Sequence, residues 1–330
     1  MFGRPVFLCV TAVLLLVDAP ARAQPRPPVE CTACNGSAFL CDKRYNEVAY
    51  PATHHSMSCR DERWFAPNQN YTIARQLADG VRALTLEVHN LFGKTYLARG
   101  NALVGRKLLV DGLAEVRAFM DSHPCEIITL IFESHVPAAD MAAALRTAGL
   151  IECLYAHAPG QPFPTLKEMV LSYRRLVIFT DREGGAYPWY HALGDYCLQT
   201  PANAKRPTDL TNQRGPGADG HPLCILNHFL TSPITSPRLA LQVNYNPLFE
   251  QRVERFIQET RRVPNFVVVD HYELGALFEV VDTINGLPWP QRRRSQPRPV
   301  VQATMFEDPV GTIGNEDTST SRTPLDPPNP

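Results

Sequence analysis

The sequence predicts an α/β protein folded as an irregular (β/α) barrel. Short apolar runs alternate along the chain with segments that have the spacing of amphipathic helices, a pattern typical of a parallel sheet covered by helices. About six of these runs read as strands, and they end in polar residues. We therefore expect a barrel that is irregular or lacks a helix, with an open sheet as the alternative.

The predicted strands are short, and two of them are almost wholly apolar. Residues 126–133 and 175–180 have the composition of strands buried on both faces of a parallel sheet. The first strand stops at Pro51 and leads into a polar turn that holds His54 and His55. In chain order, the predicted strands are 47–50, 80–88, 126–133, 175–180, 223–226 and 265–269, and 95–98 can follow 80–88 as a further short strand.

Between the strands, apolar residues recur at helical spacing. One such segment places Leu113, Val116 and Phe119 on one face and is stopped by Pro124. A long irregular stretch, 182–222, is typical of a functional loop or an insertion. The predicted helices are 72–77, 111–122, 138–148, 249–262 and 277–284, and Gly286 is the expected cap of the last one.

The two ends of the chain differ from its middle. Residues 1–23 combine Arg4, an apolar run and the small-residue signal Ala21-Arg22-Ala23, which predicts a secretory signal peptide. We expect a proline-rich spacer over 24–33, the folded barrel over 34–290 and a disordered tail over 291–330, because the tail has little to bury. The protein is then extracellular, or periplasmic if it comes from a Gram-negative bacterium.

Composition and cysteine usage agree with export. The hydrophobic fraction of 44% allows a large core, and the net charge of -1 gives no electrostatic basis for binding nucleic acid. Eight cysteines remain after Cys9 in the signal segment, and an even number favours disulfides over a metal knuckle. We expect the first four of them to form disulfides that cross-link the N-terminal segment, and Cys197 to pair with Cys224. These eight cysteines are Cys31, Cys34, Cys41, Cys59, Cys125, Cys153, Cys197 and Cys224.

Polar residues that can take part in acid–base chemistry or bind ligands gather at the ends of the predicted strands. In a closed parallel barrel these ends share one mouth. Histidine, carboxylate and arginine together suit phosphodiester chemistry, although salt bridges at a barrel rim would use the same residue types. The candidates are His54, His55, Glu87, Arg99, Glu133, Asp181, Asn227, His228, Asp270 and His271.

Several ordered motifs resemble one known family. The segments 45–54, 80–87, 126–133, 188–190, 226–229 and 265–274 are similar to the phosphatidylinositol-specific phospholipase C X-domain family in its secreted branch. The resemblance covers roughly residues 34–290. It implies a distorted TIM-type barrel, a phospholipase C-like phosphodiesterase, and a reaction in which an inositol hydroxyl attacks the lipid phosphate and releases diacylglycerol.

The resemblance also implies roles for individual residues. His54 matches the general base, and Asp270 matches the carboxylate that orients such a histidine and fixes its tautomer. Arg99 stands where the family has a second catalytic histidine. Glu87 and Glu133 match positions that bind Ca²⁺ in the calcium-dependent members.

The chain departs from the family pattern at positions that matter for chemistry. An arginine can hold a phosphate but is a poor proton donor, so Arg99 is assigned to both catalysis and substrate binding. His55 and Thr85 replace expected oxygen ligands, so the cofactor is either none or Ca²⁺. His55, His89 and His228 are the candidates for the general acid that Arg99 cannot supply. His55 is also a candidate for contacting the substrate.

Two interpretations of function follow. In one, the protein is a secreted phosphoric diester hydrolase that acts on a phospholipid or a related diester. In the other, it is a catalytically impaired barrel that binds a phosphate or lipid head group. Asp181 binds substrate hydroxyls or caps a turn. The aromatic segment 187–190 either dips into a membrane interface or packs on the barrel.

Overall fold

From a computed structural model of the chain, we describe residues 30–287 apart from 101, 104, 213–219 and 232–233. The predicted signal peptide, most of the predicted spacer, and the predicted tail with Arg292 to Arg294 lie outside the described residues. Within the described part, no helix has both the length and the apolar character needed to cross a membrane.

A ten-stranded sheet forms the centre of the molecule. Eight strands follow one another in the order β7-β6-β5-β2-β1-β10-β9-β8, with every neighbouring pair parallel. Two further strands, β3 and β4, extend β2 as an antiparallel flap. The strands are β1 Tyr50–Thr53, β2 Ala83–Leu91, β3 Lys94–Ala98, β4 Arg106–Leu108, β5 Ile128–His135, β6 Leu176–Thr180, β7 Tyr190–Ala192, β8 Cys197–Gln199, β9 Leu223–Asn227 and β10 Phe266–Val269.

The barrel is open along one side. Among the described strands, β7 and β8 each pair with a single neighbour and thus form the two edges of the parallel sheet. The short helix α5 (Leu193–Tyr196) joins these edge strands directly. The architecture is therefore a half-closed TIM-type barrel, which confirms the predicted irregular α/β barrel.

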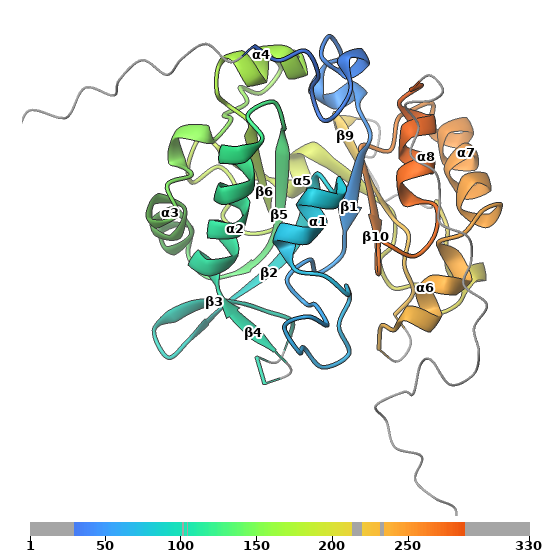
Figure 1. Ribbon diagram of the computed structural model, residues 1–330, viewed down its shortest axis with the longest axis horizontal. Coiled ribbons are helices and arrows are strands. Elements are labelled where there is room, and N and C mark those ends of the chain that lie inside the picture. Colours follow the sequence, from blue (N-terminus) through green and yellow to red (C-terminus); the bar gives the residue numbers. More distant parts are fainter. Residues whose placement is uncertain (1–29, 101, 104, 213–219, 232–233, 288–330) are drawn as a thin grey trace, which may run out of the picture.

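Helices cover the outside of the sheet. Figure 1 shows α1 and α2 in front of β2 and β5, α7 and α8 beside β10, and the β3–β4 flap and α4 at opposite ends of the molecule. Besides α5, the described α-helices are α1 Ile73–Asp79, α2 Leu109–Ser122, α3 Ala138–Thr147, α4 Leu166–Leu171, α6 Pro237–Val243, α7 Leu248–Thr260 and α8 Leu277–Ile284.

Side chains alternate between the two faces of the strands, as the pleat requires. In β2, Leu84, Leu86 and Val88 pack with the outer helices. The residues between them face the lumen, where Ala83 joins a second core cluster. Glu87 shares the direction of Ala83, so the strand carries this carboxylate along the lumen to the mouth.

The first strand differs from its prediction. Tyr45–Glu47 forms a 3-10 turn, and β1 starts at Tyr50 and includes Pro51. Proline fits here because its carbonyl still accepts a hydrogen bond from the backbone N–H of Arg82 at 2.9 Å, although its own nitrogen cannot donate. Strands β7 and β8 have three residues each and fall in the stretch 182–222, which was expected to be irregular. The three-residue strand β4 lies where no strand was predicted.

The disulfide prediction is correct only in part. The structure contains the bonds Cys31–Cys125 and Cys34–Cys41, so only the second lies within the N-terminal segment. The predicted Cys197–Cys224 bond is wrong. These residues are one register position apart on the parallel strands β8 and β9, where Cys197 pairs with Leu223, so their side chains point to opposite faces.

Candidate active site at the barrel mouth

Strand register brings the first two site residues together. Strands β1 and β10 are parallel neighbours with Thr53 opposite Val269. The next residues, His54 and Asp270, therefore leave the sheet side by side, and the backbone N–H of His54 donates to the carbonyl of Val269 at 2.9 Å. Two residues that lie 216 positions apart in the sequence thus meet at the mouth.

His54 and Asp270 form a hydrogen-bonded pair. Nδ1 of His54 lies 3.0 Å from Oδ1 of the buried Asp270. Two further donors hold the carboxylate, Nδ2 of Asn68 at 2.9 Å and the Thr235 hydroxyl at 2.5 Å. Burial opposes ionisation of Asp270, but the charge and hydrogen bond of His54, with Thr235, hold the pKa of this carboxyl below its ordinary value.

The imidazole of His54 is fixed between two rings. The Phe229 ring stacks on it with centroids 3.8 Å apart, and the His55 ring lies 4.1 Å away. No hydrogen bond to the described residues engages Nε2 of His54. This arrangement orients the ring and leaves one nitrogen available to take a proton.

Arg99 lies at the same mouth but reaches the pair through another residue. Its Nη1 donates to the Ala66 carbonyl and to Oδ1 of Asn68, both at 2.7 Å, and its Nη2 donates to the Phe65 carbonyl at 3.2 Å. Burial lowers the pKa of Arg99, and the charges of Asp270 and Glu87 partly offset this effect. The guanidinium therefore fixes the 65–68 loop and, through Asn68, the position of Asp270.

His55 occupies a strained turn beside Glu87. Its φ of 40° lies in the left-handed region, and its N–H donates to the Thr85 hydroxyl at 2.9 Å. Nδ1 lies 3.7 Å from Oε2 of Glu87. Burial, together with the charges of His54 and Arg99, holds the pKa of His55 well below its ordinary value, so this ring is neutral at physiological pH.

The two predicted acidic ligands have different surroundings. Glu87 is buried, and its Oε1 accepts from the Gly100 N–H at 2.9 Å and lies 2.7 Å from Nε2 of His89. Glu133 is opposite Glu87 in the β2–β5 register, but its side chain is 54% exposed. Its Oε1 lies 3.4 Å from Nε2 of His135.

Calcium does not fit this set of donors. Ca²⁺ prefers six to eight oxygen ligands, whereas imidazoles surround Glu87 here. The side chains of His55, His89 and His135 all have a nitrogen within 3.8 Å of a Glu87 oxygen. The Thr85 hydroxyl is already an acceptor for the His55 backbone. The described residues around Glu87 therefore do not fit Ca²⁺.

Two other predicted residues make no hydrogen bond to His54 or Asp270 among the described residues. Asp181 is exposed after β6, and its Oδ1 accepts the N–H of Ser134, in the neighbouring strand β5, at 2.8 Å. His228 is fully buried between Arg252 and the Val243 carbonyl, and burial lowers its pKa to about 3. With both ring nitrogens engaged, His228 is not available as the missing acid.

Sequence reasoning missed Asn68, Thr235 and His135. Asn68 and Thr235 come from loops without periodicity, so their proximity to Asp270 depends on long-range packing. His135 did have a signal. The tripeptides Glu87-Val88-His89 and Glu133-Ser134-His135 repeat the pattern Glu-x-His near the carboxyl ends of two strands.

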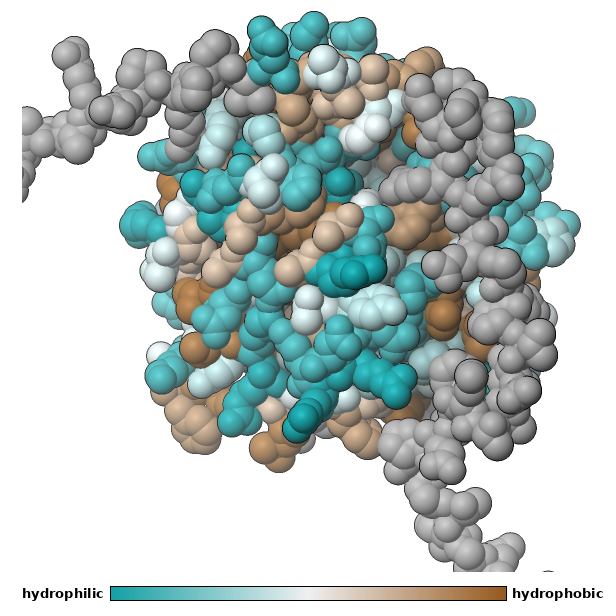
Figure 2. Space-filling view, viewed as in Figure 1, coloured by the Kyte–Doolittle hydropathy of each residue, from teal (hydrophilic) through white to brown (hydrophobic). Residues whose placement is uncertain are grey.

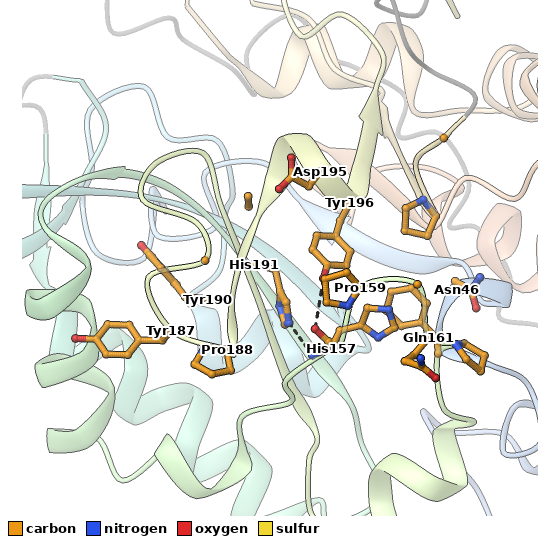
Figure 3. A pocket seen from close by; sticks show the side chains of 17 residues that line it. Asn46, His157, Pro159, Gln161, Tyr187, Pro188, Tyr190, His191, Asp195 and Tyr196 are labelled. Atoms are coloured by element: carbon orange, nitrogen blue, oxygen red, sulfur yellow. Dashed lines mark hydrogen bonds between the residues drawn. The ribbon is translucent and has the colours of Figure 1, made fainter.

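A cavity of about 580 Å³ lies elsewhere on the molecule, beside β7 and α5. Figure 3 shows that His157 and His191 lie close together in it. His191 donates from Nδ1 to the Ile178 carbonyl and accepts the His157 N–H on Nε2, and burial lowers its pKa to about 4. These histidines are neutral and structurally engaged, so the cavity offers no comparable acid–base pair.

Of the two alternatives for the aromatic segment 187–190, the structure shows packing on the barrel. The rings of Tyr187 and Trp189 stack with centroids 5.0 Å apart and contact the outer core. Tyr190 is buried within β7. Large apolar side chains are exposed instead at Phe65, Phe92 and Leu103.

Residues 40–285 match the family profile described as PI-PLC X 1. An uncharacterized secreted protein of Arthroderma benhamiae is 27% identical, with 79% of this chain and 66% of the relative aligned. A PI-PLC X domain-containing protein of Arabidopsis thaliana is 28% identical, with 84% and 71% aligned. The chain thus spans about two thirds of the length of these relatives.

A solved structure has the same fold. A mutant of the phosphatidylinositol-specific phospholipase C from Staphylococcus aureus superposes with a TM-score of 0.52 at 13% identity. The alignment covers 72% of this chain and 91% of the bacterial one. At this identity the likeness concerns the fold alone.

Proposed function

The chain belongs to the PI-PLC X domain family, and from this premise we propose that it is an exported phosphoric diester hydrolase with His54 as its general base. The observation that carries the proposal is the His54–Asp270 pair. A buried, ionised carboxylate holds one ring nitrogen at the barrel mouth while the other nitrogen stays available.

We infer the following roles for these residues from their positions. His54 donates through Nδ1–H to Asp270, so Nε2 is the basic nitrogen that accepts the proton of the attacking hydroxyl. In the family reaction that hydroxyl belongs to inositol, and its oxygen bonds to phosphorus as the bond to the lipid alcohol breaks. Asp270 stabilises the imidazolium that forms. Arg99 contributes positive charge near the developing phosphate charge and positions Asn68.

We expect slow turnover. A positioned general acid typically contributes about 10²- to 10⁴-fold to rate. Arg99 cannot serve as that acid at neutral pH, and a neutral His55 is a weak donor. Water then protonates the leaving alcohol.

The second candidate function is head-group binding without turnover. The observation that favours it is Arg99 itself, a permanent cation at the position where the family has a catalytic histidine. A barrel of this kind would retain a phosphate through charge and would not cleave it.

One assay separates the two functions. The purified protein is incubated with phosphatidylinositol and with a soluble phosphodiester, each with calcium and with chelator, beside His54→Ala and the exposed control His123→Ala. Hydrolysis by wild type and by His123→Ala, but not by His54→Ala, supports the enzyme. Indistinguishable rates for wild type and His54→Ala on every substrate reject it.

Export and membrane contact are further parts of the proposal. One relative is named a secreted protein, and the two disulfides are consistent with an oxidising compartment. The exposed residues Phe65, Phe92 and Leu103 follow β1, β2 and β3, so we assign peripheral membrane contact to this end of the barrel. Sequencing of the secreted protein should find Gln24 at its N-terminus.

A further inference from the structure

Three metal-ligating side chains gather beside the His54–Asp270 pair without a part in the proposed reaction. They are Glu87, His89 and His135, and one ligand atom from each lies within 4.8 Å of the other two. The carboxylate is buried and the two imidazoles are partly exposed, so the cluster opens toward solvent.

The cluster follows from the register of two neighbouring strands. Strands β2 and β5 are parallel, with Glu87 opposite Glu133 and His89 opposite His135. Each strand carries Glu-x-His near its carboxyl end, and residues two apart point to the same face. The pleat therefore directs all four side chains to the lumen side of the sheet.

The donor atoms already have nearly the spacing that one ion requires. Oε1 of Glu87 lies 2.7 Å from Nε2 of His89 and 3.8 Å from Nε2 of His135. Ligands at about 2.0–2.2 Å from a tetrahedral ion are about 3.4 Å apart, so small side-chain rotations suffice. The two imidazoles stack with centroids 4.3 Å apart and an interplanar angle of 12°, which limits their freedom before any ion binds.

We propose that Glu87, His89 and His135 bind one divalent transition-metal ion of the Zn²⁺ class. Two imidazoles and one carboxylate match the His₂Glu ligand set of three-ligand zinc sites, in which a further position stays open for water or an anion. The same set is a poor match to Ca²⁺, which takes oxygen ligands.

Neighbouring groups support the carboxylate ligand. The N–H of Gly100 donates to Oε1 of Glu87 at 2.9 Å and fixes its orientation. Glu133 lies 3.4 Å from Nε2 of His135 and supplies a second acidic group at the solvent side. The site does not rest on the proposed hydrolase function, because it is defined by metal binding without turnover.

The test uses Co²⁺ as a spectroscopic substitute for Zn²⁺. Full-length protein is freed of metal by chelation, then titrated with Co²⁺ while visible d–d absorption is recorded. We expect saturation at one ion per chain, displacement by Zn²⁺, and no displacement by Ca²⁺. A titration without a saturable band, or displacement by Ca²⁺ as effective as that by Zn²⁺, overturns the proposal.

Variants then locate the ion. His89→Phe and His135→Phe keep the stacked aromatic shape but lose the ligand nitrogen, and Glu87→Gln keeps the size of the carboxylate. Each should weaken Co²⁺ binding by more than about tenfold, whereas the exposed His123→Ala should bind as wild type does. Thermal melting identifies any variant that has lost its fold. If the folded variants retain the wild-type affinity, the assignment to these residues is wrong.

Discussion

At the residue scale, the central feature of the site is the Asp270 carboxylate, whose oxygens accept hydrogen bonds from three side chains. Asp270 accepts from His54, Asn68 and Thr235. These three donors are compatible only with the ionised carboxylate, because a protonated carboxyl or an amide at position 270 would point its own hydrogen at one of them. This requirement explains why a buried carboxyl keeps a low pKa despite the cost of burial.

The first prediction tests this carboxylate. Asp270→Asn should lower kcat by about 10²- to 10⁴-fold, because the amide cannot fix the Nδ1–H tautomer of His54 or stabilise its charged form. The change should leave KM for the diester nearly unaltered. Steady-state kinetics measure both parameters, with the exposed Asp195→Asn as the matched control. Equal loss in both variants would contradict the role of Asp270.

The second prediction concerns Arg99. Lysine keeps the charge but cannot reach Ala66, Asn68 and Phe65 at once, so Arg99→Lys should reduce kcat/KM by about tenfold. Hydrogen exchange at residues 65–68 should accelerate in the same variant. Arg106→Lys, at an exposed arginine of the flap, is the control.

Replacement of Arg99 by histidine distinguishes its two possible roles. If Arg99 acts mainly by fixing the loop, Arg99→His should lose activity as Arg99→Lys does. A large gain in turnover would instead identify a missing general acid as the main defect of the site.

At the element scale, buried strands and long helices could be predicted from the sequence, and short elements could not. The helix α8 has the predicted bounds, because its apolar spacing is strong and Gly286 follows it. Strands β7 and β8 have three residues each, too few to show a period of two. Their existence depends on pairing with β6 and β9, which is a tertiary effect.

The same distinction holds for the site. Asp270 was predictable because it directly follows a strand with a clear apolar pattern, whereas the predicted strand 47–50 ends before His54, whose role came from the resemblance to the family. Asn68 was not, because its contact with Asp270 spans 202 positions and begins in a loop. The predicted Cys197–Cys224 disulfide was wrong because spacing in the sequence does not reveal the strand register, which places the two side chains on opposite faces of the sheet.

The third prediction belongs to the junction between α2 and β6. The buried Arg175 donates from Nη1 to the His123 and Glu126 carbonyls and from Nη2 to the Met120 carbonyl, all within 3.1 Å. Arg175→Met removes the guanidinium donors from these carbonyls, of which that of His123 still accepts the Glu126 N–H, and should cost about 2–4 kcal/mol of unfolding free energy. Urea denaturation measures this change, and the exposed Arg174→Met should cost far less.

At the scale of the whole molecule, one carboxyl makes stability depend on pH. Glu273 lies between the 68–72 loop and the start of the final helical segment, and Asn70 donates to its Oε1 at 2.5 Å. Its other oxygen is buried without a hydrogen-bond partner among the described residues. Burial, aided by Asp79 and Asp61, raises the pKa of Glu273 to about 7.

The fourth prediction follows from the sign of this shift. Below the unfolded pKa both states carry the proton, so Glu273 causes no penalty there. As pH rises through the folded pKa, the folded state must hold a buried charge and loses stability relative to acidic pH. Glu273→Gln should therefore raise Tm by several degrees at pH 8 and have little effect near pH 4.5. A melting series over this range checks it, with exposed Glu254→Gln as control.

The two ends of the barrel provide the last prediction, which concerns the membrane. Figure 2 shows a largely hydrophilic helix-covered face, with hydrophobic side chains along the lower edge where β3 and β4 lie in Figure 1. Phe92 is 96% exposed and Leu103 is 83% exposed at this end, whereas Leu171, 64% exposed, ends α4 at the opposite end.

If the mouth contacts lipid, Phe92 and Leu103 enter the interface and Leu171 stays in water. Burial of one such side chain contributes about 1.5–3 kcal/mol, so Phe92→Ser or Leu103→Ser should weaken binding to phosphatidylinositol vesicles by about tenfold or more. Leu171→Ser removes comparable apolar surface and should bind as wild type does. Co-sedimentation with vesicles measures the three affinities. Equal weakening by Leu171→Ser would show that general surface hydrophobicity, and not the orientation of the barrel mouth, controls attachment.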